Sequence, residues 1–184
     1  DPFIQYGMVA GIQAFRDSGF EVTDQNAHRV GCAIGSGIGG IGSIEDTAML
    51  VEQKGPKRVS PFVVPGAIIN MIAGNLSILY NLQGPNLAVV TACTTGTHNI
   101  GLVARLIAAG DVDAMLVGGA EMATPPVGIG GFAAARALST RNDDPLRASR
   151  PWAADRAGFV LGARAGMLLV AADASDQDKW APIY

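Results

Sequence analysis

The chain has 184 residues, enough for one domain with a sizeable core, and a formal net charge of −3. This acidic balance argues against general affinity for nucleic acid, which requires a basic field. Charged residues make up only 16% of the sequence, against about 25% in an ordinary soluble domain. Residues 59–104 contain no Asp, Glu, Lys or Arg, so we expect this part to be buried in the core and against a partner surface.

The charge-free run does not predict a membrane span. Proline, asparagine and glutamine residues interrupt it, and no stretch of about 20 apolar residues remains. The two cysteines, Cys32 and Cys93, are too few for a disulfide framework and suit a reducing compartment. The sequence shows no leader typical of secretion, so we expect a cytoplasmic protein.

Hydrophobic spacing and glycine or proline breaks predict the elements of the first half. Apolar residues at helical spacing predict an opening helix that ends at Gly19, and a segment that is apolar nearly all round predicts a buried helix. In chain order the expected elements are a helix over 4–15, a strand over 30–34, a helix over 43–53, a buried helix over 66–79 and a strand over 87–90.

A glycine-rich loop follows the first predicted strand. Gly35, Gly37 and Gly40 match the G-x-G-x-x-G pattern, and a helix-like segment follows them, as in dinucleotide-binding sites. The alternative is a loop that passes close to another backbone. The acidic residue expected about 20 positions later is absent, and a basic spot, Lys57 and Arg58, lies there instead. Those two side chains belong either to a solvated loop or to a docking site for an acidic carrier.

Cys93 lies where the strand over 87–90 gives way to a helix that runs to about residue 110. The unpaired N–H groups and the dipole at a helix N-terminus favour a thiolate and could bind an oxyanion. A buried, unreactive cysteine is the alternative. His98 falls well round the helix from the thiol, so we interpret it as structural.

The second half completes an α/β pattern. A buried strand over 112–117 leads to Gly118–Glu121, which we expect to be a loop at the end where open α/β sheets place their sites. A helix over 128–137 carries Phe132 and Arg136, and a polar loop follows it. Strands over 159–162 and 167–170 are expected to form a hairpin, and the tail from 173 is left open. The order predicts a layered α/β fold: a mainly parallel sheet with one antiparallel strand and helices on both faces.

Several short motifs occur together in this chain: Thr91-Ala-Cys93-Thr, His98-Asn-Ile-Gly101, Gly118-Gly-Ala-Glu121, Gly130-Gly-Phe132, Ala137-Leu-Ser-Thr140 and Ser149-Arg-Pro-Trp152. They resemble the β-ketoacyl-[acyl-carrier-protein] synthases of type II fatty-acid elongation. The resemblance covers nearly the whole chain and implies one partial domain, an interior segment of the N-terminal half of a thiolase fold. It also implies a homodimer.

The resemblance implies a decarboxylating condensation without a cofactor or metal. Cys93 would take an acyl group from acyl carrier protein, and malonyl carrier would lose CO₂ and attack that thioester. The Cys93 amide would be one oxyanion donor. Ile38 and Phe132 would line the acyl pocket, and Val63 would reach it from the dimer partner. The positions that would meet the carrier protein are Lys57, Arg58 and Arg136.

The chain also departs from the family pattern. The family's two catalytic histidines, its lysine and a second oxyanion donor come from the other half of the fold, and His28 and His98 match none of them. Ala157, Ala163 and Arg164 stand where the family usually has Asp, an acidic residue and Gly. We therefore expect no condensation by this chain alone. The other hypotheses are a non-catalytic scaffold that binds acyl chains and carrier, and an NAD(P)-dependent oxidoreductase built on the glycine-rich loop.

Overall fold

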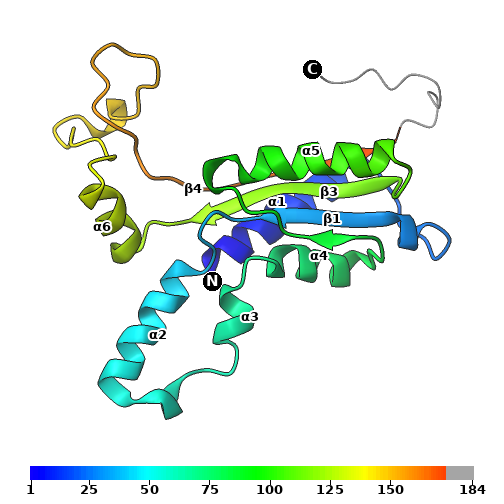
Figure 1. The fold of residues 1–184 in the computed structure, drawn as a ribbon, viewed down its shortest axis with the longest axis horizontal. Helices are drawn as coiled ribbons and strands as arrows, with labels where there is room; N and C mark the ends of the chain where they lie inside the picture. Colours follow the sequence, from blue (N-terminus) through cyan, green and yellow to red (C-terminus); the bar gives the residue numbers. More distant parts are fainter. Residues whose placement is uncertain (173–184) are drawn as a thin grey trace.

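The computed structural model describes residues 1–172, which form a four-stranded sheet with helices on both faces (Figure 1). The strand order is β2-β1-β3-β4. β1 is parallel to both of its neighbours, and β4 is antiparallel to β3. This confirms the predicted mainly parallel sheet with one antiparallel strand, while the tail over 173–184 lies outside the described residues. The strands are β1 (Val30–Gly35), β2 (Asn86–Leu87), β3 (Ala114–Met122) and β4 (Ala163–Ala171).

Three helices cover the sheet, and three lie toward one end of it. α1 and α4 pack on one face and α5 on the other, whereas α2, α3 and α6 extend beyond the strands (Figure 1). The α-helices are α1 (Pro2–Ser18), α2 (Ile41–Lys54), α3 (Val63–Ala67), α4 (Met71–Tyr80), α5 (Thr95–Ala108) and α6 (Pro126–Ala134).

β3 shows how the two faces of the sheet are filled. Leu116 packs into the core beneath α1 and α4, and its neighbours Met115 and Val117 pack beneath α5. All three side chains are fully buried. A parallel strand covered on both faces has this continuous apolar character. The strand begins at Ala114 and runs to Met122, so Gly118–Glu121 form its second half and the expected loop there is wrong.

The single buried helix expected over 66–79 is two helices. The chain is extended at Ile68, between α3 and α4. The break lies where this segment meets the glycine-rich loop: the Ala67 carbonyl accepts a hydrogen bond from the Gly40 N–H at 3.0 Å. α4 is also less buried than expected, since the Ile78 side chain is 79% exposed.

Three other element predictions are corrected. The expected strand over 87–90 is the two-residue β2, whose pairing ends at Leu87. The expected hairpin over 159–162 and 167–170 is one strand, β4, and Phe159 forms an isolated bridge with Leu138. α6 ends at Ala134, so Arg136 lies beyond it, in the left-handed backbone region.

Candidate active site

A cavity of about 750 Å³ opens beside the carboxyl ends of β1 and β3. Its lining is mainly apolar or glycine, and it brings together Ile38, Cys93 and Phe132, which come from three different parts of the sequence. The charged residues of the lining are Glu121 on β3 and Arg164 on β4, which are cross-strand neighbours. An exposed thiol therefore lies at the wall of a mainly apolar cavity.

Cys93 lies in a 3₁₀ turn, Ala92–Thr94, directly before α5. The preceding Ala92 has φ 53, a left-handed conformation that costs energy for a residue with a Cβ. The first backbone hydrogen bond of the turn is donated by the Thr94 N–H to the Thr91 carbonyl at 3.2 Å. The Cys93 N–H comes one residue earlier, at the start of the helical segment, where N–H groups have no partner within the helix. The sharp turn presents the thiol at the cavity surface.

Asn99, fully buried in α5, positions this turn. Its amide nitrogen donates to the Val89 carbonyl at 3.0 Å, and its amide oxygen accepts from the Val89 N–H at 3.3 Å. The side chain thus takes the hydrogen bonds that a neighbouring strand would provide, which explains why β2 ends at Leu87. The hydroxyl of Thr95 accepts from the Thr91 N–H at 3.0 Å and holds the other side of the turn.

The two remaining polar groups of interest are the other cysteine and His98. Cys32 is fully buried in β1, and burial raises the pKa of its thiol to about 12. The exposed His98 has its Nδ1 within hydrogen-bonding distance of Thr91 Oγ1. It therefore supports the turn that carries Cys93, in agreement with a structural role.

The glycine-rich loop does not present a free phosphate cradle. A Glu121 carboxylate oxygen accepts from the Ile38 N–H at 2.9 Å, and the Ser36 hydroxyl accepts from the Gly39 N–H at 3.1 Å. At the start of α2 the Ser43 N–H donates to the Asp1 carboxylate at 2.9 Å. These donors are those a dinucleotide phosphate would need, and two carboxylates would repel it. The geometry disfavours the oxidoreductase hypothesis.

An aromatic pair closes part of the cavity. The rings of Phe132 and Phe159 meet edge to face, with centroids 5.3 Å apart. Phe159 is held by backbone hydrogen bonds to the segment after α6: its N–H donates to the Ala137 carbonyl at 3.0 Å, and its carbonyl accepts from the Ser139 N–H at 2.9 Å. The aromatic wall is therefore fixed from two segments of the chain.

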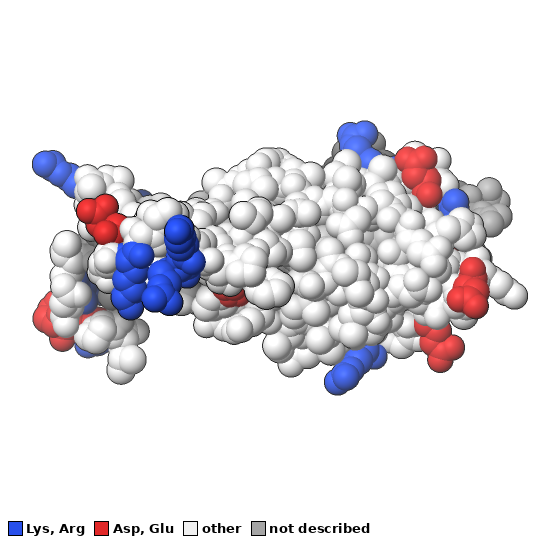
Figure 2. Space-filling model, turned by 90° about the horizontal axis from the view of Figure 1, so that it is seen from below, with Lys and Arg blue, Asp and Glu red and all other residues white. Residues whose placement is uncertain are grey.

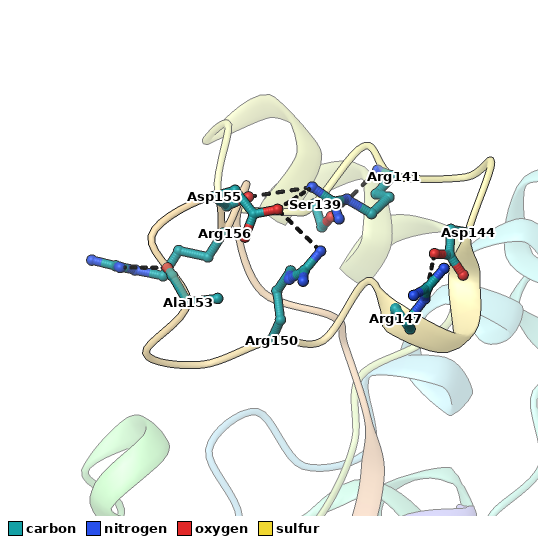
Figure 3. A network of polar contacts seen from close by, with 8 residues as sticks. All are labelled: Ser139, Arg141, Asp144, Arg147, Arg150, Ala153, Asp155 and Arg156. Carbon is teal, nitrogen blue, oxygen red and sulfur yellow. Dashed lines mark hydrogen bonds and ion pairs between the residues drawn. The ribbon is translucent and has the colours of Figure 1, made fainter.

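The loop between these two segments is tied by ion pairs (Figure 3). Asp155 lies between two arginines, Arg141 at 3.2 Å and Arg150 at 3.1 Å. The hydrogen bond from Arg141, with the charge of Arg150, lowers the pKa of the Asp155 carboxyl. Partly exposed pairs of this kind contribute little to overall stability, and this network joins residues of the same loop.

The other predicted site residues lie outside the cavity lining. Val63 is half-buried at the start of α3. Lys57 and Arg58 are exposed in a 3₁₀ turn (Pro56–Arg58) after α2, and Arg136 is exposed after α6. Figure 2 shows a group of basic side chains at one end of a wide, largely uncharged face, with other charged side chains along its edges. Among residues 1–172 no group of three or more His, Cys, Asp or Glu side chains is placed to hold a metal ion.

Sequence reasoning missed the roles of Asn99 and Glu121. A signal for Asn99 was present: it occupies a buried stripe of α5 with Thr95, Val103 and Ile107, at helical spacing. A polar residue in such a stripe requires a partner when it is buried. Glu121 was noted, but as part of a loop rather than as a strand residue that faces the glycine-rich loop.

Comparison with known proteins decides the family. A sequence profile described as "Beta-ketoacyl synthase, N-terminal domain" matches residues 1–175. The chain belongs to this family. A 3-oxoacyl-[acyl-carrier-protein] synthase 2 from Vibrio cholerae is 59% identical over 184 residues, which is 100% of this chain and 44% of the relative. A protein of the same description from Coxiella burnetii is 58% identical over 170 residues, 92% of this chain and 41% of that relative.

Solved structures of the family share the fold. A β-ketoacyl synthase from Burkholderia phymatum has a TM-score of 0.79 and 31% identity, over 92% of this chain and 41% of that one. The second solved structure is a complex of a type II polyketide synthase acyl-carrier protein with its ketosynthase, bound to a hexaketide. It has a TM-score of 0.84 and 26% identity, over 91% of this chain and 42% of that chain. The chain thus spans less than half the length of each of these relatives. No helix among residues 1–172 is long and apolar enough to cross a membrane.

Proposed function

We propose that this chain supplies the nucleophile-bearing part of a β-ketoacyl-[acyl-carrier-protein] synthase that elongates fatty acyl chains, with Cys93 as the nucleophile. The observation that carries the proposal is an exposed thiol on a strained turn before α5, at the wall of a mainly apolar cavity. Reactive cysteines occupy accessible positions, and a helix N-terminus is one of the settings that favour the thiolate. Two free cysteines agree with a cytoplasmic protein, which is the compartment we propose.

The reaction divides into two steps at Cys93. The thiolate attacks the acyl thioester carbonyl, a new carbon–sulfur bond forms, and the carrier leaves as a thiol after taking up a proton. Malonyl carrier then loses CO₂, and the electron pair of the broken carbon–carbon bond attacks the acyl-enzyme carbonyl. The Cys93 thiolate leaves, and the product is a β-ketoacyl thioester longer by two carbons. The Cys93 N–H is the oxyanion donor that this chain contributes.

We assign the acyl pocket to Ile38 and Phe132, supported by their place in the lining of the Cys93 cavity. Val63 does not line the Cys93 cavity of its own chain. We assign it to the acyl pocket of the partner in a homodimer. Apolar walls exclude water from the acyl-enzyme, which protects the thioester from hydrolysis. We propose no cofactor or metal for this chemistry.

Acyl carrier protein, acyl- and malonyl-loaded, is the partner that we propose for Lys57, Arg58 and Arg136. Two observations support this assignment. The three side chains are exposed and basic, and the polyketide ketosynthase described above is in complex with its acyl-carrier protein. Charge reversal, Lys57→Glu with Arg58→Glu, should slow acyl transfer from the carrier but leave transfer from an N-acetylcysteamine thioester unchanged, because only the carrier needs the basic surface. Equal loss with both donors would contradict a docking role.

A second copy of the protein is the partner that we propose for the uncharged face in Figure 2. The exposed apolar side chains of α3 and α4 support this: Val64 is 65% exposed and Ile78 is 79% exposed. Burying such a surface stabilises association, whereas leaving it in water favours aggregation. Ile78→Glu should shift the protein toward monomer in sedimentation velocity. Leu146→Glu, at a side chain 96% exposed in the loop after α6, is the control and should leave the association state unchanged.

The test of function uses a chimera in which residues 1–184 replace the matching 184 residues of the Vibrio cholerae relative. Incubated with acyl and malonyl carrier, this chimera should form a β-ketoacyl product, and its Cys93→Ala variant should form none. Acyl carrier binding without any acylated thiol would favour the scaffold hypothesis. Tight NAD(P) binding would favour the oxidoreductase.

A further inference from the structure

Glu121 bridges the end of β3 and the glycine-rich loop after β1. The pairing of β1 with β3 ends at Gly35 and Gly119, where β1 ends, and β3 continues past this point to Met122. Glu121 therefore lies on the part of β3 that extends beside the loop after β1. One carboxylate oxygen of Glu121 accepts from the Ser36 hydroxyl at 3.0 Å, and the other accepts from the Ile38 N–H at 2.9 Å. Both oxygens are therefore used on this loop.

Ser36 extends the contact by one residue. Its side chain is buried, and its oxygen accepts from the Gly39 N–H at 3.1 Å while its hydroxyl donates to Glu121. A Cβ at Gly37 would lie 2.8 Å from a Glu121 oxygen, so a glycine is needed there for the carboxylate to approach. The loop backbone is thus shaped around the carboxylate on three successive residues.

Arg164 does not compete for this carboxylate. It is the cross-strand neighbour of Glu121 on β4 and lines the same cavity. The ion pairs found within residues 1–172 nevertheless do not include these two residues. The charge of Glu121 is directed to the loop, and hydrogen bonds to a charged acceptor are stronger than neutral ones.

Ile38 joins this loop to the cavity. Its N–H donates to Glu121, and the residue lines the same cavity as Cys93. We propose that Glu121 is a positioning residue that fixes Ile38 at the cavity wall and thereby selects the length of the acyl chain. This inference rests on the proposed function. A fixed wall rejects chains that do not fit, whereas a loosened loop leaves the position of Ile38 undefined and weakens the contact with long chains.

Two variants separate the effect of the hydrogen bonds that Glu121 accepts from Ser36 and Ile38 from the effect of its charge. Glu121→Ala removes both acceptors. Glu121→Gln removes the charge but keeps one acceptor for the Ile38 N–H and a donor for the Ser36 oxygen. Glu21→Gln is the charge-matched control, since this exposed residue lies before β1, away from the cavity.

Kinetics of the chimera with hexanoyl and dodecanoyl pantetheine thioesters test the selection. Glu121→Ala should raise the KM for dodecanoyl roughly tenfold, with KM for hexanoyl and kcat for both changed by about twofold at most. Glu121→Gln and Glu21→Gln should keep the parent ratio of the two KM values. Equal ratios in Glu121→Ala and the parent would overturn the proposal.

Hydrogen exchange gives a second measurement that does not depend on activity. In Glu121→Ala the Ile38 and Gly39 amides should exchange roughly tenfold faster than in the parent, and in Glu121→Gln much less so. Exchange rates of these amides that are the same in Glu121→Ala and in the parent would also overturn the proposal that Glu121 fixes the loop. A parent chimera that binds acyl thioesters but never acylates Cys93 would contradict the proposed function itself, and the exchange result would still decide whether Glu121 holds the loop.

Discussion

The two cysteines of this chain lie in opposite environments. Cys32 is enclosed in β1 between two helix layers, and Cys93 is exposed at the cavity. Only an accessible thiol that can ionise acts as a nucleophile. The fold thus leaves one cysteine available for covalent chemistry and protects the other.

The raised pKa of Cys32 predicts a loss of stability in alkali. The unfolded thiol ionises near 9.0 and the folded one near 12. Because the folded pKa is the higher, this group favours the folded state fully below pH 9 and loses that contribution as the pH rises toward 12. Its share of the free energy of unfolding should fall by about 1.4 kcal/mol per pH unit in that window.

Urea unfolding at a series of alkaline pH values measures this slope. Cys32→Ala removes the titrating group and serves as the comparison, since the other groups that ionise there are the same in both proteins. The variant should start less stable, because of the cavity left by the sulfur, but lose stability less steeply. Parallel slopes for the two proteins would contradict the assignment.

At the residue scale the sequence predicted Cys93, Ile38 and Phe132 as site candidates, and the structure places all three on one cavity. A cysteine between a strand and a helix leaves a local pattern that can be read from the sequence, whereas Ile38 and Phe132 were predicted from the family resemblance. The roles of Asn99 and Glu121 depend on contacts with residues 10 and 83 positions away, and no local pattern reports such contacts.

At the scale of elements, the Cys93 turn is held by the packing of α5 against β1. A Cβ at Gly35 would lie 2.3 Å from the Val89 carbonyl oxygen and 2.6 Å from Thr95 Cγ2. The strand and the turn can approach this closely only because residue 35 has no side chain. Gly35 therefore serves the packing of the turn rather than a phosphate.

Gly35→Ala should destabilise the protein by about 3 kcal/mol, because a backbone oxygen must move to admit the methyl group. The same variant should slow alkylation of Cys93. Gly101→Ala on α5 is the matched control, because a Cβ added at this position would have no atom within 4 Å outside its own helix backbone and chain neighbours. It should be neutral or stabilising by up to about 1 kcal/mol, since alanine favours a helix. Denaturant midpoints of the two variants compare these effects, and a Gly35→Ala protein as stable as Gly101→Ala would contradict the packing argument.

Element prediction failed where tertiary contacts override local pattern. The strand over 87–90 was shortened because Asn99 takes the hydrogen bonds of Val89. The helix over 66–79 was broken where Ala67 meets Gly40. By contrast, α1 and β1 follow from hydrophobic spacing alone, since each lies against the core along its whole length.

At the scale of the whole molecule, the cavity contains the proposed nucleophile, Cys93, without the histidine and lysine side chains that would complete a set of acid and base groups. Neither of the two histidines, and no lysine, lines the cavity among residues 1–172. Decarboxylation requires donors placed to within about 1 Å, as does the attack that follows. Residues 1–184 alone should therefore accept an acyl group but release no β-ketoacyl product from malonyl carrier.

Product analysis by mass spectrometry checks this prediction, with the chimera as the positive control in the same assay. Product from a pure sample of the 184-residue chain would contradict it. Such a result would require the proton donors to come from residues other than those that line the cavity.

Cys93 as the acylated nucleophile is tested by locating the acyl group after brief exposure of the folded chain to a fatty acyl thioester. Intact mass followed by peptide mapping distinguishes the two cysteines, and circular dichroism establishes that the sample is folded. We expect one acyl group, on the exposed Cys93, and none on the buried Cys32. A folded sample in which Cys93 stays unmodified, or in which both thiols are acylated equally, would contradict it.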